Sequence, residues 1–233
     1  MKTPLLDHGY VELIESWGSD ERIVESARMS TAKSFRGWGT PDAPGDEKLL
    51  RYLWEHHHAT PFEMAGLTVE VKAPLIVFRE WHRHRTQSYN EMSARYIPLP
   101  DENYVPTVER ILAGANTATT NKQAQGNGRT LTSEEAQAWL MDIESVYASA
   151  QRVYERGIAL GVPKELARLP VPVGRYSVMR ASANLRNWLA FLTLRCDPAA
   201  QWEIRVYADA IAEMIRAAFP RTYEVAKGAF SRE

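Results

Sequence analysis

Between residues 67 and 95 a strand, a helix and a dense polar segment follow one another directly. Residues 67–72 alternate apolar and polar side chains, which is typical of a strand buried on one face. Pro74 then begins a helix that carries Phe78 and Trp81 and ends near His84. The polar segment therefore begins where that helix ends, and we expect the rest of it to lie on the following loop.

The polar segment, Arg83 to Arg95, reads R-H-R-T-Q-S-Y-N-E-M-S-A-R and contains three arginines and no lysine. Guanidinium groups offer fixed donors that suit phosphates and the flat edges of nucleobases. The hydroxyls and the carboxylate between them supply the acceptors that such a ligand also needs. A surface arginine cluster and a nucleic-acid patch are the alternatives for a basic segment. Because the net charge is −1, we expect a small anionic ligand rather than nucleic acid or a membrane surface.

The bulk composition is that of an ordinary globular protein, with 45% hydrophobic and 24% charged residues in 233. No apolar run approaches the ~20 residues that a membrane-spanning helix needs. The N-terminus carries no signal-peptide pattern. The single cysteine, Cys196, excludes internal disulfides and a cysteine metal cage. We therefore expect one cytoplasmic domain over residues 1–233.

Periodicity and capping signals predict the remaining elements. We expect a strand at residues 11–17 and helices that begin at Asp20, at Asp46 (ending at His57), at Glu134 (ending at Ala159) and at Asp197 (ending near Pro220). Ser133 is the expected cap of the long helix, whose apolar stripe is formed by Trp139, Ile143, Val146, Tyr147, Ala150 and Val153 or Tyr154. Residues 114–133 are polar and nearly devoid of large apolar side chains, so we expect a flexible surface loop there.

Three adjacent histidines, His56, His57 and His58, invite comparison with a metal site. Side chains at adjacent helix positions point in different directions and cannot share one metal ion. No second cluster of ligands follows at metal spacing. We therefore expect no metal.

Two helix starts have simple capping explanations. Thr60-Pro61-Phe62-Glu63 has the form of a capping box, with Thr60 at the N-cap and Glu63 at the third helical position, although free amides at a helix start also favour a phosphate or carbonyl oxygen. Asn184 is likewise a good N-cap. On the helix that follows, Arg186 and Ala190 share one face, and Arg195 lies on another with Trp188, Phe191 and Leu192. Because an arginine on an apolar stripe is costly to bury unpaired, we expect Arg195 to meet an anion or a polar ligand.

The ordered pattern R-H-R-x-x-S-x-N-E-x-S-x-R of residues 83–95 resembles the signature of flavin-dependent thymidylate synthases, and every fixed position is filled. The segment from His58 to Glu63 resembles a second signature of that family. A third similarity runs through Ala167-Arg168, Leu169-Pro170, Tyr176-Ser177, Asn184-Leu185-Arg186 and Leu194-Arg195. The chain departs from many relatives at Ala190, where they carry asparagine or histidine, at Glu80, where some carry glutamine, and at residues 178–182, which are less aromatic.

The resemblance implies a fold and a reaction. The fold is a single α+β domain with an antiparallel or mixed sheet flanked by long helices, assembled as a homotetramer with sites between subunits. The reaction is methylation of dUMP at C5 to give dTMP. The carbon comes from methylenetetrahydrofolate, and the hydride comes from FAD that NADPH has reduced.

Methylation at C5 of uracil requires a nucleophilic C5. Addition of a thiolate at C6 is one route, and Cys196 is the only candidate for it, although a lone cysteine with no histidine nearby in the sequence is more often a packing residue. The other route stabilises the negative charge that develops on the pyrimidine with positioned donors, at about 3–4 kcal/mol for one donor. We expect Arg195 to be that donor, at the N3/O4 edge of the base. The resemblance also implies catalysis without an enzyme nucleophile.

The resemblance assigns residues to roles. Arg195 and His58 are the expected catalytic residues, with His58 orienting flavin or folate. FAD is expected to contact Ser30, Thr60, Glu63, Arg83, His84, Arg85, Glu91, Asn184, Arg186 and Ala190. The nucleotide is expected to contact Glu80, Arg83, Glu91, Met92, Ser93, Ala94, Arg95, Arg168 and Arg195. The alternatives are a related hydroxymethyltransferase for pyrimidine nucleotides, a nucleic-acid binder and a metal hydrolase.

Overall fold

The computed structural model describes residues 1–40, 42–43, 45–115 and 129–230. Within these ranges one sheet has the order β1-β2-β3-β5-β4, and every neighbouring pair is antiparallel. The strands are β1 (Lys2–Leu5), β2 (Gly9–Trp17), β3 (Gly66–Pro74), β4 (Ser88–Glu91) and β5 (Tyr176–Asn184). The α+β prediction is confirmed, and the described sheet is antiparallel rather than mixed.

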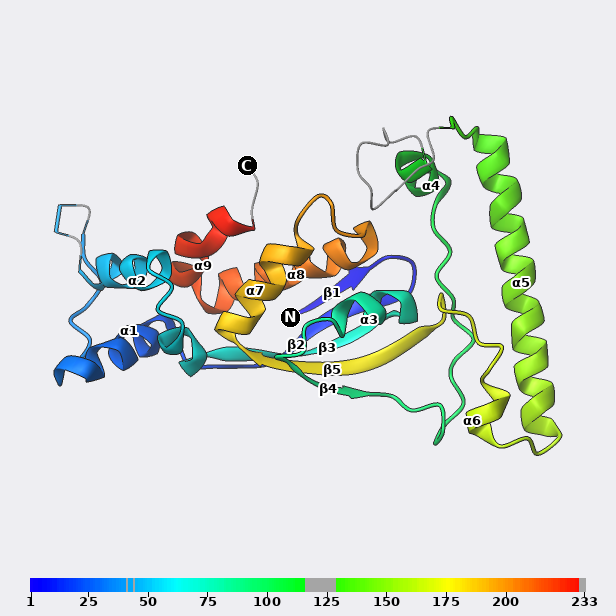
Figure 1. Ribbon diagram of the computed structural model, residues 1–233, viewed down its shortest axis with the longest axis horizontal. Helices are drawn as coiled ribbons and strands as arrows, with labels where there is room; N and C mark the ends of the chain where they lie inside the picture. Colours follow the sequence, from blue (N-terminus) through cyan, green and yellow to red (C-terminus); the bar gives the residue numbers. More distant parts are fainter. Residues whose placement is uncertain (41, 44, 116–128, 231–233) are drawn as a thin grey trace.

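Helices cover one face of this sheet, as Figure 1 shows for α3 (Leu75–Trp81), α7 (Leu185–Arg195) and α8 (Trp202–Ala218). The alternation predicted in β3 is present. Val69 and Val71 are fully buried in the core, whereas Glu70 points to the opposite face and pairs with Arg180 of β5 at 3.3 Å. The sheet therefore has one apolar, covered face and one polar face.

The predicted inward side of α8 is buried throughout, at Ile204, Tyr207, Ala208, Ile211 and Ile215. The helix begins at Trp202, however, so the expected start at Asp197 is wrong. The Asp197 carboxylate accepts a hydrogen bond from the Ala199 amide (2.8 Å), which closes a turn ahead of the helix. The short elements α9 (Pro220–Ala226) and η3 (Lys227–Ala229) follow α8.

At one end of the sheet lie α1 (Asp20–Arg28), η1 (Met29–Thr31), α2 (Asp46–Glu55) and η2 (Thr60–Met64) (Figure 1). α2 ends at Glu55 instead of the predicted His57. His57 adopts a φ of 56°, and the amides of His57 and His58 donate to the carbonyls of Trp54 (3.1 Å) and Leu53 (2.8 Å). This is a Schellman motif, which usually has glycine at the left-handed position.

The capping box predicted at Thr60 is wrong. Ala59 already has helical backbone angles (φ −71°, ψ −42°), so Thr60 lies inside the turn of η2 and its side chain makes no cap hydrogen bond. Glu63 is free to pair with Arg186 of α7 at 2.7 Å. Glu63 therefore links η2 to α7 by an ion pair instead of capping the start of a helix.

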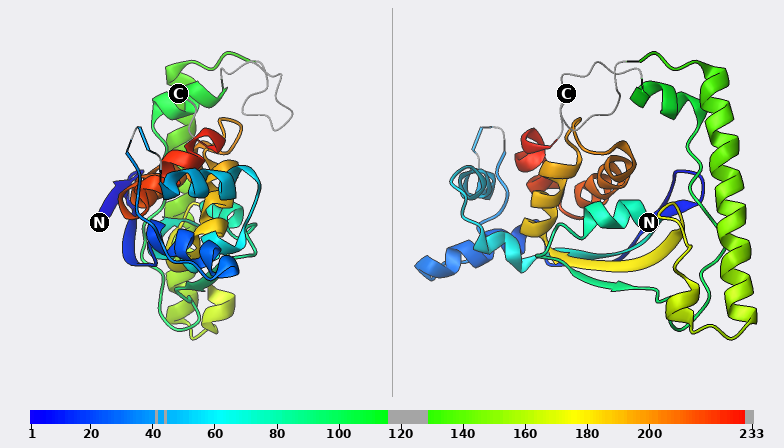
Figure 2. Two further views of the ribbon diagram at one scale, coloured as in Figure 1. Left: turned by 90° about the vertical axis from the view of Figure 1, so that its left-hand side faces the viewer. Right: turned by 45° about the vertical axis from the view of Figure 1, so that its right-hand side comes forward.

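The other end of the molecule holds α4 (Val108–Ala115), α5 (Ser133–Ala159) and α6 (Lys164–Ala167), and Figure 2 shows α5 standing apart from the sheet. The cap of α5 is Thr132 in a capping box with Glu135, so the predicted cap, Ser133, is the first residue of the helix. Of the loop expected at 114–133, residues 116–128 lie outside the described residues. No helix in the described part of the chain is long and apolar enough to cross a membrane.

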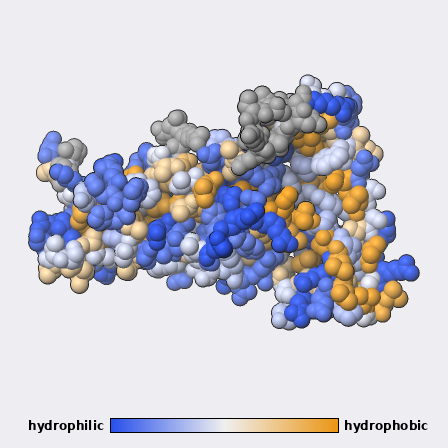
Figure 3. Space-filling view, in the orientation of Figure 1, coloured by the Kyte–Doolittle hydropathy of each residue, from blue (hydrophilic) through white to orange (hydrophobic). Residues whose placement is uncertain are grey.

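Part of the predicted stripe of α5 is exposed. Trp139, Val146 and Val153 of that stripe are 47%, 56% and 56% exposed. Leu160, which caps the end of α5 and was not predicted, is 70% exposed and continues the same seven-residue spacing. On the face drawn in Figure 3, apolar side chains gather where α5 and α6 lie. We call these four residues the α5 stripe.

Candidate active site

The arginine-rich motif turns from the end of α3 into an edge strand. Residues 83–85 form the turn, and β4 continues the motif beside β5, so the expectation of a loop beyond the helix is wrong for β4. The Tyr89 hydroxyl donates to the His84 carbonyl oxygen (2.6 Å), which ties the strand to the turn. The motif is therefore held at both its start and its middle.

Arg195, at the end of α7, is anchored against this turn. Its Nε donates to His84 Nε2 (2.8 Å), one terminal nitrogen donates to the Glu80 carboxylate (2.9 Å) and the other donates to the Glu80 carbonyl oxygen (2.8 Å). The side chain is 14% exposed. The predicted polar partner of Arg195 is thus provided within the chain, by residues 80–84, and the guanidinium plane is fixed.

The contact with Arg195 determines the protonation state and the tautomer of His84. Burial, and next the positive charge of Arg195, lower the pKa of His84 from 6.5 to about 4. The imidazole is therefore neutral at neutral pH. Because its Nε2 accepts from Arg195, its remaining proton is on Nδ1.

A cavity of about 480 Å³ lies between α3, the end of β4 and α6, and we call it the α3–α6 pocket. It brings together four residues predicted to bind the nucleotide, Glu91, Met92, Ala94 and Arg168. The rest of its lining consists of Leu75, Phe78, Arg79, His82, Leu99, Glu165, Leu169, Val171 and Ser177. The pocket thus combines two guanidinium groups, two carboxylates and an apolar wall.

Two further predicted nucleotide residues lie close to the α3–α6 pocket without lining it. The guanidinium of Arg95 pairs with the carboxylate of Glu165, a lining residue, at 3.2 Å. Ser93 lies between the lining residues Met92 and Ala94, and its hydroxyl accepts from the Arg95 amide (3.3 Å). Arg95 is exposed, so its pair with Glu165 is free to rearrange around a ligand.

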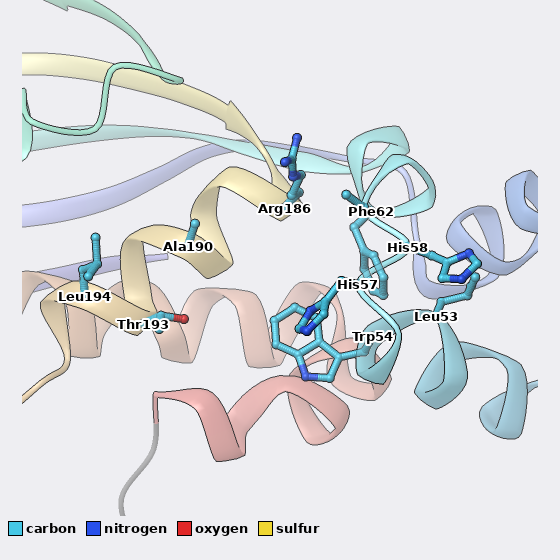
Figure 4. A pocket seen from close by; sticks show the side chains of 10 residues that line it. Leu53, Trp54, His57, His58, Phe62, Arg186, Ala190, Thr193 and Leu194 are labelled. Atoms are coloured by element: carbon cyan, nitrogen blue, oxygen red, sulfur yellow. The ribbon is translucent and has the colours of Figure 1, made fainter.

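A second cavity, of about 470 Å³, lies between α2, η2 and α7, and we call it the α2–α7 pocket (Figure 4). It contains three predicted residues, His58, Arg186 and Ala190. Its other lining residues are Leu53, Trp54, His57, Ala59, Phe62, Thr193 and Leu194. The small side chain of Ala190 leaves this wall apolar where an asparagine or histidine would add a polar group.

The arginine-rich turn reaches the α2–α7 pocket through the first turn of α7. The Asn184 side chain caps this helix by accepting from the Asn187 amide (3.0 Å), as predicted. The Asn187 side chain donates to the Thr86 carbonyl oxygen (3.0 Å). Arg85, next to Thr86, is exposed, as is Arg186, next to Asn187. The backbone of the arginine-rich turn therefore lies beside the first turn of α7.

The single chain does not gather all predicted residues into one pocket. Ser30 is exposed in η1, with its hydroxyl donating to the Ala27 carbonyl oxygen (3.0 Å), and Thr60 and Arg83 are also exposed. None of the three lines either pocket, and neither does Arg195. Arg168 lines the α3–α6 pocket, so the predicted arginines are divided between several surfaces of one chain.

Cys196 follows Arg195 and is half-buried, packed against the core. Burial, followed by the neighbouring Asp209 carboxylate, raises the pKa of the Cys196 thiol to about 12. The thiol is therefore protonated at neutral pH, which argues against its use as a nucleophile. No group of three or more potential metal-ligating side chains is found among the described residues.

Several pocket residues were not predicted from the sequence. Leu75, Phe78, Arg79 and His82 form one face of α3 at the spacing i, i+3, i+4, i+7, so helical periodicity identifies that face once the helix is placed. Ser177 and Glu165 come from elements distant in the sequence. Ser177 belongs to the third similarity to the family, but nothing in that segment assigns it to a site, and no local signal marks Glu165.

The fold is similar to that of known nucleotide methylases. The structure of the UMP/dUMP methylase PolB from Streptomyces cacaoi bound with 5-Br UMP aligns with a TM-score of 0.82 and 31% identity, over 97% of this chain and 96% of that one. The same protein bound with 5-Br dUMP aligns with a TM-score of 0.83 and 32% identity. The fold and the arginine-lined pockets therefore define the class of this chain as a methyltransferase.

The sequence comparisons give the family. The model of the family described as "Thymidylate synthase complementing protein" matches residues 12–221. A "Flavin-dependent thymidylate synthase" of Ruegeria pomeroyi is 40% identical over 95% of this chain and 71% of its own length. Two proteins of the same name also match. The one from Thermus thermophilus is 41% identical over 93% of this chain and 75% of its own length. The one from Thermotoga neapolitana is 37% identical over 96% of this chain and 93% of its own length. The chain belongs to the flavin-dependent thymidylate synthase family, as the motif predicted.

Proposed function

We propose that this enzyme methylates dUMP at C5 to give dTMP, with methylenetetrahydrofolate as the carbon donor and NADPH-reduced FAD as the hydride source. The observation that carries the proposal is the guanidinium of Arg195, fixed by hydrogen bonds to Glu80 and to the neutral His84. Together with family membership, this gives a positioned positive charge for the reaction.

Arg195 is proposed to stabilise the negative charge that develops on the pyrimidine. A donor that is already oriented needs no reorganisation when the charge appears, and it acts more strongly where water is excluded. Because its three hydrogen bonds use residues of the same chain, Arg195 keeps its orientation while the base approaches. His84 in its neutral form adds no competing cation beside it.

The α3–α6 pocket is the proposed site of the nucleotide. Arg168 in its lining and Arg95 at its edge suit a phosphate, since guanidinium groups bind phosphate oxygens in pairs. Glu91 supplies an acceptor for a sugar hydroxyl or a base N–H, and the apolar wall suits the face of a pyrimidine.

The α2–α7 pocket fits a flavin. Trp54, His57 and Phe62 offer aromatic walls to a flat ring, and Arg85 and Arg186 stand near the N-terminus of α7, where phosphates are favoured. A bound flavin supplies hydride chemistry that protein side chains lack. Glu63 holds Arg186 in place, and His58 is the proposed residue for orienting flavin or folate.

We further propose that the complete site forms between subunits of a homotetramer. Within one chain the two pockets are separate, and Arg83 and Ser30 line neither of them. The exposed α5 stripe offers an apolar surface for such an assembly. A second copy of the chain that adds its arginines to these pockets would explain why predicted site residues such as Arg83 and Ser30 are exposed in a single chain.

Purified protein should be yellow, with the spectrum of oxidised flavin. Incubation with dUMP, methylenetetrahydrofolate and NADPH should yield dTMP, identified by the mass of the product. A hydroxymethylated product would instead identify the enzyme as a pyrimidine nucleotide hydroxymethyltransferase. Colourless protein that does not turn over dUMP after incubation with FAD would contradict it.

A further inference from the structure

Ser177 has a buried hydroxyl with no protein partner in the α3–α6 pocket. The residue is the second of β5, lies opposite Ala73 of β3 and is 1% exposed. Its Oγ is fully enclosed, and among the described residues it makes no hydrogen bond. It nevertheless belongs to the lining of the cavity. The hydroxyl therefore lies between the sheet and the pocket.

A hydroxyl in this place is not explained by packing. Ser177 lies on the helix-covered face of β5, where Met179 and Ala181 are buried apolar residues. A buried hydroxyl without a partner is less stable than an apolar group of similar size, because it has lost its hydrogen bonds to water. Alanine would satisfy the strand and the core equally well. The hydroxyl thus has a physical role only when something in the cavity pairs with it.

The surroundings define the chemistry of that partner. Arg79, His82 and Arg168 line the same cavity and favour an anionic or oxygen-rich ligand. Phe78 and Leu75 add apolar surface to the lining, which lowers the local polarity and strengthens a hydrogen bond made in the cavity. A serine hydroxyl in a cavity lined by the guanidinium groups of Arg79 and Arg168 suits donation to a ligand oxygen that these groups also attract.

We propose that Ser177 binds the nucleotide, with its Oγ donating a hydrogen bond to an oxygen of the substrate in the α3–α6 pocket. The inference rests on the proposed function, because it takes dUMP to be the occupant of that pocket. It adds a residue from β5 to nucleotide-binding residues that otherwise come from the arginine-rich motif, Glu80, Arg168 and Arg195.

The test is titration of the purified, flavin-loaded full-length enzyme with dUMP by calorimetry, comparing the wild type with Ser177→Ala. We expect the Kd for dUMP to rise roughly three- to tenfold, as for the loss of one hydrogen bond. The unfolding temperature of the ligand-free variant should stay the same or rise, since the buried hydroxyl has been removed. Ser182→Ala is the matched control, because Ser182 is in the same strand, pairs with Thr68 (3.0 Å) and lies outside the pocket lining.

Deoxyuridine, which lacks the phosphate, identifies the accepting oxygen. A loss of affinity for dUMP alone assigns the bond to the phosphate, and a loss for both ligands assigns it to the nucleoside; either result supports the proposal. Equal dUMP affinity in the wild type and in Ser177→Ala overturns it and leaves the proposed function intact. Absence of dUMP binding to the wild type overturns both.

Discussion

At the scale of single residues, Arg195 illustrates how a buried cation is made compatible with an apolar helix face. Its neighbours Trp188, Phe191 and Leu192 are buried in the core. Its charge is met by the Glu80 carboxylate, and a carbonyl oxygen and an imidazole nitrogen accept from two more of its five N–H donors, which leaves two N–H groups for a ligand. Each donor therefore has a defined direction. A lysine has no such fork and is not equivalent here.

Arg195→Ala should lower kcat by about two to three orders of magnitude, which is typical for the loss of one oriented donor to developing charge. Arg195→Lys should recover little of this activity, because the ammonium group cannot keep the same directions. Steady-state assays of dTMP formation, with the flavin content measured in each variant, provide the test. Arg216→Ala is the control, since Arg216 is exposed on α8 and pairs only locally with Glu213. Full activity in Arg195→Ala would remove the proposed catalytic role.

His84 should make the stability of the enzyme dependent on pH. Its pKa is about 4 in the folded chain and near 6.5 in the unfolded chain, so between these values the unfolded chain binds more protons. The His84 contribution is therefore fully present above pH 6.5 and is lost as the pH falls toward 4. Urea unfolding should show that the free energy of unfolding falls less between pH 7 and pH 5 for His84→Gln than for the wild type. His8→Gln, at an exposed position, is the control, and an unchanged difference in His84→Gln would contradict this account.

At the scale of elements, the end of α2 holds a strained residue next to the proposed flavin pocket. His57 occupies the left-handed position of the Schellman motif, where a side chain is costly and glycine is not. His57→Gly should increase the free energy of unfolding by about 0.5–1 kcal/mol, since the relief of strain exceeds the added freedom of the unfolded chain.

Denaturant unfolding of the flavin-free protein measures this effect. His56→Gly is the matched control, because His56 has a φ of −98° and gains nothing from glycine. We expect that control to be destabilised. A loss of stability in His57→Gly would mean that the contacts of its imidazole outweigh the backbone strain.

Sequence periodicity predicted those elements whose own residues carry the pattern. β3 and α8 were predicted because the alternation at Val69 and Val71 and the helical spacing through Ile211 mark their buried faces. β4 was missed because Ser88-Tyr89-Asn90-Glu91 contains no apolar alternation, and its strand character comes from pairing with β5. The cap at Thr60 failed for a different reason. The backbone of Ala59 had already entered the helical turn.

The candidate site likewise contains residues that the sequence predicted and residues that only the fold brings to it. Motif residues such as Glu91 and Arg168 were predicted from the sequence, and the structure brings both into one cavity. The contact of Glu80 with Arg195 joins residues on two helices and has no local signature. Ser177 was invisible as a site residue because its distinguishing property, a hydroxyl without a partner, exists only after β5 is packed.

At the scale of the whole molecule, only the α2–α7 pocket is remote from the exposed apolar surface, because the α3–α6 pocket is lined partly by α6, which packs beside α5. The α2–α7 pocket is near one end of the sheet, and α5 stands beyond the other. The α5 stripe recurs at heptad spacing, which is the pattern of a helix that packs against another helix. Because Val146, Val153 and Leu160 are each more than half exposed, we expect a second copy of the chain to cover them.

The double variant Val146→Glu/Val153→Glu should therefore dissociate the assembly. Two carboxylates in the middle of an apolar helix contact would have to be desolvated without partners, which strongly disfavours association. Light scattering after gel filtration should give several times the chain mass of 26.4 kDa for the wild type and a lower mass for the variant. Activity should fall with the mass if subunits share the site. Ile14→Glu, at an exposed apolar position on β2, should keep the wild-type mass. A monomeric, fully active wild type would mean that one chain completes the site and that the α5 stripe has another purpose.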